Sequence, residues 1–269
     1  MKLLTLNTHS WMEEEMATNF EDLVARVLEE DYDVIALQEI NQLMTSEEVD
    51  QVLNHVPLSV NPPIHEDNYA LRLVEALQEK GKTYYWAWAY NHIGYERFHE
   101  GVAILSKTPI EVVDILASQA VDPGDHHTRR ALLARTSVEG QALSLVSLHL
   151  SWWEKGFEIE WPRLAQALES EENPLVLLGD FNNPTGNQGY QEVINSRLNL
   201  VDSHAVADEI SGNHTILADI DGWEGNDLAL KVDHAFVDKS FKVNSSKVVF
   251  DGDHSPVVSD HFGLEIEIV

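Results

Sequence analysis

Short apolar runs that end in polar side chains are the feature that most constrains the fold of this chain. Residues 34–37 and 175–178 are uninterrupted apolar segments, and they are followed directly by Gln38-Glu39 and by Gly179-Asp180. Runs of this length are typical of strands that are buried on both faces. Such strands need a packed layer on each side, so the sequence predicts sheets that are covered by other elements.

The remaining strand signals are spread along the whole chain. We expect strands over residues 1–7, 33–38, 84–90, 101–106, 110–116, 130–138, 142–150, 174–178, 231–237, 247–250 and 263–268. Strands that follow each other without a helix should be antiparallel neighbours. No linker, low-complexity tract or internal repeat interrupts the pattern. The sequence therefore predicts one α+β domain over residues 1–269, with two packed sheets covered by helices.

Helices are predicted from capping residues and from the spacing of apolar side chains. Thr18 with Glu21 and Thr45 with Glu48 fit capping boxes, and the second helix should continue to about residue 55. Further helices are expected over residues 67–80, which Gly81 would cap, over 157–170 and over 187–196. Pro162 should kink the helix over 157–170 or begin a new turn.

Composition excludes several classes of protein. The chain has 269 residues and no cysteine, which excludes disulfide scaffolds, thiolate metal sites and cysteine nucleophiles. No apolar run reaches the roughly 18 residues that a membrane-spanning helix needs. The first residues lack an apolar stretch long enough for a signal peptide, so we expect a cytoplasmic protein.

The net charge of −29, from 17 basic and 46 acidic residues, repels nucleic acid and anionic membranes over most of the surface. Solubility alone is the simplest explanation of such a charge. The alternative is that some carboxylates converge on a cation, and only their positions can decide between the two.

Polar groups recur where apolar strands end or enter the core. Each has an ordinary explanation, because acidic residues form turns and a lone buried histidine usually satisfies core hydrogen bonds. Together they form an ordered set that a metal and a ligand would compensate. The set comprises Asn7, Gln38-Glu39, His149, Asp180, Asn182, Asp233 and Asp260-His261.

The order of these motifs resembles the endonuclease/exonuclease/phosphatase superfamily, the group that contains deoxyribonuclease I. The resemblance rests on Gln38-Glu39, Ser147-Leu-His149, Gly179-Asp-Phe-Asn182 and Ser259-Asp-His261, together with Asn7, Asp233 and the segment 101–106, and it covers essentially the whole chain. It implies a four-layer αββα sandwich of two mainly antiparallel sheets flanked by helices. It also implies Mg²⁺-dependent cleavage of a phosphate ester at one end of the sheets, with Mn²⁺ as the alternative metal.

The resemblance also implies roles for individual residues. Asn7 and Glu39 match the residues that hold the metal, and Asp260 matches an aspartate that either lies on the metal side or supports a histidine. Asp180 and Asn182 match the pair that orients water or substrate phosphate. The catalytic positions are His149, Asp180, His261, Asp233 and Glu100. Among these, Asp233 would support His261 and Glu100 would pair with His149. The segment around Asp233 departs from the sequence pattern of the superfamily at His234, where tyrosine is common.

The chemistry of these side chains agrees with that assignment. Mg²⁺ prefers a few carboxylate and amide oxygens and keeps several waters, which suits Glu39 and Asn7. Either Asp180 or His261 can orient and deprotonate water, and an imidazolium at His149 can stabilise developing charge. Supporting carboxylates should raise the pKa of both imidazoles.

Other features leave more than one interpretation open. The densest group of basic residues is Arg129-Arg130 with Arg135. We expect Arg130 to bind substrate phosphate. The alternative is that these arginines lie on a strand edge and prevent it from pairing with another sheet. Trp152-Trp153 could line a substrate pocket or could pack in the core or on the surface. Asp221-Gly222-Trp223 resembles a loop of bacterial members of the superfamily.

The scarcity of basic residues favours a phosphorylated small molecule or lipid head group over duplex DNA as the substrate. An endonuclease or exonuclease is the alternative enzyme. A non-catalytic module that binds a phosphate ligand is the alternative of another class, and it would be expected to have lost a site residue. None of Glu39, His149, Asp180, Asn182 and His261 is lost.

Overall fold

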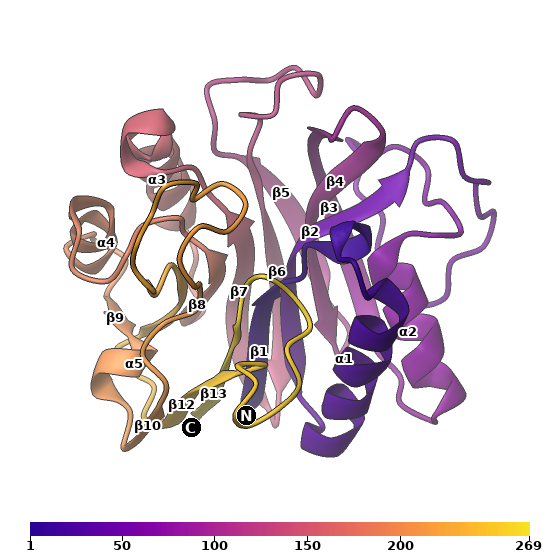
Figure 1. The fold of residues 1–269 in the computed structure, drawn as a ribbon. Coiled ribbons are helices and arrows are strands. Elements are labelled where there is room, and N and C mark those ends of the chain that lie inside the picture. Colours follow the sequence, from indigo (N-terminus) through magenta and orange to yellow (C-terminus); the bar gives the residue numbers. More distant parts are fainter.

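The computed structural model describes residues 1–269 and has the predicted architecture, with two sheets packed face to face and helices on their outer faces (Figure 1). The first sheet consists, in spatial order, of β10 (Glu209–Ser211), β12 (Val243–Val249), β13 (Gly263–Ile268), β1 (Lys2–Asn7), β2 (Val34–Leu43), β4 (Phe98–Ser106) and β3 (Tyr85–Gly94). The second consists of β5 (Glu111–Leu116), β6 (Arg130–Val138), β7 (Gln141–His149), β8 (Leu175–Asp180), β11 (Asp233–Asp238) and β9 (Leu200–Asp202).

Neighbouring strands are mainly antiparallel, as predicted. The parallel pairs are β1 with β2, β10 with β12, and β7 with β8. A helix, with further chain around it, lies between the two strands of the β1–β2 pair and of the β7–β8 pair, as a parallel connection requires.

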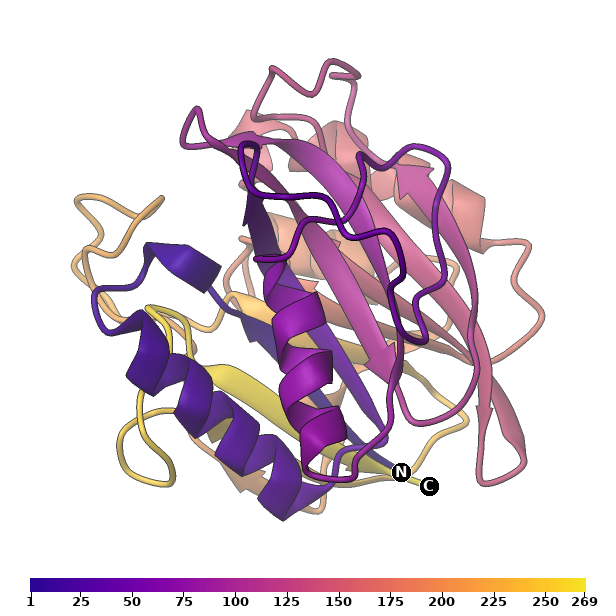
Figure 2. The ribbon, with the colours of Figure 1, turned by 90° about the vertical axis from the view of Figure 1, so that its right-hand side faces the viewer.

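The outer faces of the sheets are covered by different helices. On the first sheet lie α1 (Met16–Glu30) and α2 (Tyr69–Glu79), which Figure 2 shows side by side across that face. On the second lie α3 (Phe157–Leu168) and α4 (Gln188–Ile194), while the short α5 (Ser203–Val206) joins β9 to β10. The helices bury apolar stripes against the sheets, such as Leu23 and Val27 of α1.

The apolar runs read from the sequence are strands with both faces buried. In β8, Val176 and Leu178 point into the core between the sheets, whereas Leu175 and Leu177 pack beneath the helices. Successive side chains of a strand point to opposite faces, so a strand with both faces buried needs no polar alternation.

One predicted helix is wrong. Residues 45–55 form turns, and their backbone pairs instead with residues 64–66 and with Trp86. A backbone that bonds to the edge of a sheet cannot also make helical bonds. The helix α1 begins at Met16, before the expected cap, and Pro162 lies within α3 without ending it. The short elements β9, β10 and α5 had no clear sequence signal.

The two ends of the chain meet, because the amino group of Met1 donates a hydrogen bond to the carbonyl of Ile268 at 2.8 Å. The helices are all too short or too polar to cross a membrane.

Candidate active site

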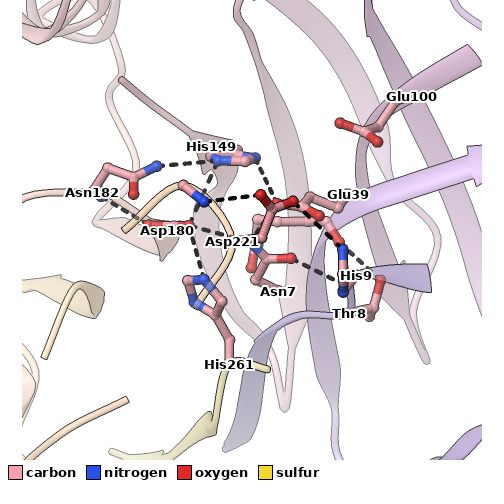
Figure 3. Close-up of polar contacts among 12 residues, drawn as sticks. Asn7, Thr8, His9, Glu39, Glu100, His149, Asp180, Asn182, Asp221 and His261 are labelled. Carbon is pink, nitrogen blue, oxygen red and sulfur yellow. Dashed lines mark hydrogen bonds and ion pairs between the residues drawn. The ribbon is translucent and has the colours of Figure 1, made fainter. Parts of the chain in front are cut away.

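The predicted polar residues gather at one end of the two sheets (Figure 3). Strand pairing brings them together, since Asn7 lies beside Gln38, and Asp180 lies between His149 and Asp233. The side chain of Gln38 crosses between the sheets and donates to Oγ of Ser147 at 3.1 Å. The two halves of the site, one from each sheet, are therefore fixed relative to one another.

Asp180 lies at the centre of the site and is almost fully buried, at 1% exposure. Its Oδ2 lies 3.5 Å from Nε2 of His149 and 3.8 Å from Nε2 of His261. Asn7 donates to the same oxygen at 3.2 Å, and the backbone N–H of Asn182 donates to Oδ1 at 2.8 Å. Burial and the charge of Asp233 raise the pKa of Asp180 to about 7.

His261 is held by the carboxylate of Asp233. Nδ1 of His261 lies 2.9 Å from Oδ2 of Asp233, which leaves Nε2 facing Asp180. Burial lowers the pKa of His261, but the charges of Asp233 and Asp180 outweigh it and hold the pKa well above its usual value. The predicted support of His261 by Asp233 is present in the structure.

His149 is held differently, through the amide of Asn182. Nε1 of Trp223 donates to Oδ1 of Asn182 at 3.1 Å, so the Asn182 amide nitrogen is turned toward Nε2 of His149, 3.2 Å away. In this arrangement Nε2 accepts and the proton is on Nδ1, which faces Oε1 of Glu39 at 3.9 Å. Burial, followed by the charge of Arg129, lowers the pKa of His149 well below its usual value. This direction is opposite to the rise in pKa that the sequence analysis expected for His149, and the surroundings of the ring favour its neutral form.

Glu39 is presented to the site by a β-bulge. The register of β2 against β4 shifts between Leu37 and Ile40, and Glu39 has a left-handed backbone with φ of 55°. Bulges re-aim side chains, and strained backbone of this kind persists where the surroundings fix it. Asn7 donates to Oε1 of Glu39 at 2.9 Å, and Asp260 lines the same cavity.

These oxygen donors fit a divalent cation. Burial and the charge of Glu100 raise the pKa of Glu39 to about 8, although His9 opposes the shift. Oε2 of Glu100 and Oδ1 of Asp233 are buried without a hydrogen-bond partner. A buried excess of carboxylate oxygen is compensated by a hard cation, for which carboxylate and amide oxygens are the preferred ligands.

The chain matches the model of the endonuclease/exonuclease/phosphatase family over residues 11–261. The protein belongs to this family. It is accordingly a hydrolase that acts on phosphate ester bonds. No curated protein matches the chain.

Solved structures agree with the family assignment. An endonuclease/exonuclease/phosphatase family protein from Leptotrichia buccalis is 31% identical over 100% of this chain and 99% of its own, with a TM-score of 0.86. Two more distant structures share the fold. A mannosyl-6-phosphatase from Bacteroides thetaiotaomicron is 18% identical, with a TM-score of 0.67 over 100% of this chain and 99% of that one. The human Nocturnin catalytic domain is 15% identical, with a TM-score of 0.68, over 100% of this chain and 93% of that one.

Two of the predicted site residues of this family member have other partners. Glu100 faces His92, with Oε1 3.3 Å from Nε2, and makes no contact with His149. The reason is that β4 and β3 pair His92 with Glu100 in the first sheet, whereas His149 is in the second. Arg130 forms an ion pair with Asp114 of the neighbouring strand, and it is Arg129 that lines the cavity.

The loop that carries Asp221-Gly222-Trp223 closes one side of the family site. It belongs to the orange segment between β10 and β11 (Figure 1). The hydroxyl of Tyr95 donates to Oδ2 of Asp221 at 2.6 Å, while Trp223 fixes Asn182 as described above. The loop therefore sets the orientation of a side chain at the reaction centre.

Two residues of the site were missed by the sequence predictions, namely His9 and Tyr95. His9 Nδ1 lies 3.0 Å from Oε1 of Glu13 and 3.8 Å from Oδ1 of Asp260. Burial lowers the pKa of His9, but Glu13, Glu39 and Asp260 raise it to about 9. The position of His9 two residues after Asn7 was the available signal, whereas Tyr95 had none. Trp223 was noted as part of a loop, but the sequence did not indicate its contact with Asn182.

The cavity at the site has a volume of about 560 Å³, which is in the range of small-molecule sites. Its acidic lining residues are Glu39, Glu100, Asp180, Asp221, Glu224 and Asp260. It is also lined by the basic side chains of Arg129 and Lys155 and by several histidines, which include His92, His126 and His127.

Proposed function

We propose that this protein is a Mg²⁺-dependent phosphoesterase that hydrolyses a phosphorylated small molecule or a lipid head group, with residues 1–269 acting as one catalytic domain. The observation that carries the proposal is the position of Asp180. One of its oxygens faces the Nε2 atoms of both His149 and His261, and the oxygen donors Asn7 and Glu39 lie beside it.

Glu39, Asn7 and Asp260 are the residues that would hold the metal. When bound, Mg²⁺ neutralises the charge of a phosphate and stabilises the transition state of hydrolysis. Mn²⁺, which accepts the same oxygen ligands, is the alternative. The bulge at Glu39 and the hydrogen bond from Asn7 orient the ligands before any metal binds.

We assign the general base to Asp180. The sequence left Asp180 and His261 as alternatives. His261 lies between two carboxylates, Asp233 at 2.9 Å and Asp180 at 3.8 Å, and this environment favours the protonated ring. A protonated ring cannot accept a proton from water, but it can donate a hydrogen bond to a phosphate oxygen. Asp180 remains as the group that orients the attacking water and takes its proton.

Asn182 and His149 would complete the binding of the phosphate. The amide of Asn182 is fixed on one side by Trp223 and reaches His149 on the other. Neutral His149 carries its proton on Nδ1, facing Glu39, so it contributes a fixed dipole next to the metal ligands. Preorganised dipoles of this kind stabilise charge in a transition state without reorganisation.

The charge of the protein supports a small substrate. A net charge of −29 opposes the approach of long nucleic acids, which bind mainly through many phosphate contacts. A mannosyl-6-phosphatase shares the fold, which is consistent with a small phosphate ester as substrate. The nuclease alternative stays open within the family.

A phosphoesterase panel tests the proposal. It compares mannose 6-phosphate, inositol phosphates, sphingomyelin, duplex DNA and abasic DNA, each with Mg²⁺ and with EDTA, for the wild type and Asp180→Asn. Metal-dependent release of product from a small ester, lost in Asp180→Asn, supports the proposal. Nicking of plasmid DNA, or nanomolar binding of a labelled duplex at about 150 mM salt, would favour the nuclease. Binding of phosphate compounds without any hydrolysis would favour the binding module.

A further inference from the structure

Arg129 is a buried cation that forms no ion pair within the protein. Its side chain lines the cavity, and the residue is only 6% exposed. Its guanidinium makes no ion pair or hydrogen bond, and its Nε is fully buried without a partner. The neighbouring Arg130 and Arg135, by contrast, pair with Asp114 and Glu171. A buried and unpaired charge is costly, and a bound anion would remove the cost.

The backbone of Arg129 lies two strands away from that of Asp180, the residue at the centre of the site. It directly precedes β6, and the order of the second sheet is β6, β7, β8, so His149 of β7 lies between Arg129 and Asp180 of β8. With neighbouring strands about 4.8 Å apart, the backbones of Arg129 and Asp180 are roughly 10 Å apart. A phosphate beside Asp180 therefore leaves room for a second group near Arg129.

A second basic side chain lines the same cavity. Nζ of Lys155 lies 4.6 Å from the ring centroid of Trp152, and both residues line the cavity. The carboxylate of Glu160, buried in α3, accepts hydrogen bonds from the backbone and the hydroxyl of Ser151 at 2.7 Å. Burial raises the pKa of Glu160 and the charge of Arg129 opposes the rise, but the two residues form no ion pair. Arg129 and Lys155 therefore line the cavity without an ion-pair partner.

We propose that Arg129 and Lys155 form a second anion-binding subsite, and that preferred substrates carry a second phosphate group besides the one that is hydrolysed. This inference deepens the proposed function and rests on it for the position of the first phosphate. The planar guanidinium binds a phosphate through two parallel hydrogen bonds, and Lys155 adds a mobile charge at the rim. The substrate class is then a bisphosphorylated small molecule.

The test is a calorimetric comparison of fructose 1,6-bisphosphate with fructose 6-phosphate as probes, in EDTA so that neither is hydrolysed. The wild type should bind the bisphosphate at least about 10-fold more tightly. Arg129→Gln should bring the two affinities close together, while Arg129→Lys should keep most of the preference. Lys155→Gln, at an exposed position, should lower the preference even if Arg129→Gln proves unstable. Lys242→Gln, which removes a charge from an exposed ion pair with Asp208, should leave the preference unchanged.

Two results would overturn the inference. One is equal affinity of the wild type for both probes. The other is that Arg129→Gln lowers the affinity for both probes by the same factor, which would place Arg129 on the phosphate that both probes share. Phosphate release from the same probes with Mg²⁺ is measured separately. A preference for the bisphosphate without any turnover would defeat the proposed hydrolysis and leave the subsite standing. Turnover without preference would defeat the subsite alone.

Discussion

Asp233 holds His261 by a contact of 2.9 Å between Oδ2 and Nδ1, so that the other ring nitrogen faces the carboxylate of Asp180. The two residues are 28 positions apart and come from different halves of the fold, since Asp233 begins β11 of the second sheet and His261 lies two residues before β13 of the first. This contact fixes the orientation of the ring, and the charge of Asp233 raises the pKa of His261.

Replacement of Asp233 by asparagine should therefore lower kcat by about 10²–10⁴-fold, the usual scale for losing the function of an acid–base group. KM should change little, because the phosphate-binding residues remain. Steady-state kinetics on the substrate that the panel identifies provide the measurement. Asp202→Asn serves as the control, since Asp202 is buried in the same sheet but bonds to Tyr190 and Lys231. A kcat for Asp233→Asn equal to that of the control would show that Asp233 only supports the fold.

His149 and His261 face one oxygen of Asp180, and this shared partner predicts that their effects are not additive. His149→Ala and His261→Ala should each reduce kcat by about 10²–10⁴-fold. The double variant should be little worse than the poorer single variant, as expected for groups that act as a unit. The measurement is kcat for the wild type, the two single variants and the double variant. Near wild-type turnover in either single variant would make that histidine a structural residue.

Glu39 should be required for metal binding but not for folding. Glu39→Gln should reduce Mg²⁺ affinity by at least the 10–100-fold that loss of a ligand's partner typically costs. The thermal midpoint should stay close to that of the wild type, because the glutamine can keep the bulge and the hydrogen bond with Asn7. Calorimetric titration with Mg²⁺ measures the change. The matched control is Glu171→Gln, whose carboxylate pairs with Arg135 away from the cavity. If Glu39→Gln and the control bind Mg²⁺ alike, Glu39 is not a ligand.

Trp223 should act on turnover through Asn182. Trp223→Phe keeps an aromatic ring but loses the N–H that fixes the Asn182 amide, 3.1 Å away. We expect kcat to fall about 5- to 30-fold, equivalent to the roughly 1–2 kcal/mol that a hydrogen bond of this kind contributes. Trp153→Phe, on the outer side near Phe157, is the control. Unchanged turnover in Trp223→Phe would mean that the loop only covers the cavity.

His55 should make stability depend on pH. Its ring packs on Trp86 at 4.5 Å between centroids, and burial lowers its pKa from 6.5 to about 4. Between about pH 6.5 and 4, His55 is protonated in the unfolded chain but remains neutral in the folded one. The free energy of unfolding therefore falls as the pH falls through this window. His55→Phe keeps the packing and removes the proton. Urea unfolding at about pH 7.5 and pH 5 should show a smaller loss of stability in the variant, and an equal loss would contradict the assignment.

The sequence by itself determined the two-sheet sandwich and most of the site. Apolar runs such as 175–178 identify strands buried on both faces, and a polar residue that follows such a run must lie at the end of a sheet. Local patterns of this kind depend on near neighbours in the chain. For that reason Asn7, Glu39, His149, Asp180 and His261 were found together.

Tertiary structure alone decided which side chains face one another. The pairing of β3 with β4 places Glu100 next to His92. The loop before β11 places Trp223 in contact with Asn182, from which it is 41 positions away in the sequence. Arg129 lines the cavity, whereas Arg130 forms an ion pair with Asp114 of the neighbouring strand. The pKa of a histidine follows from the same contacts, since burial and the charge of Arg129 lower the pKa of His149, whereas the carboxylates of Asp233 and Asp180 raise the pKa of His261. Register, loop closure and burial depend on residues far apart in the chain, and no local pattern encodes them.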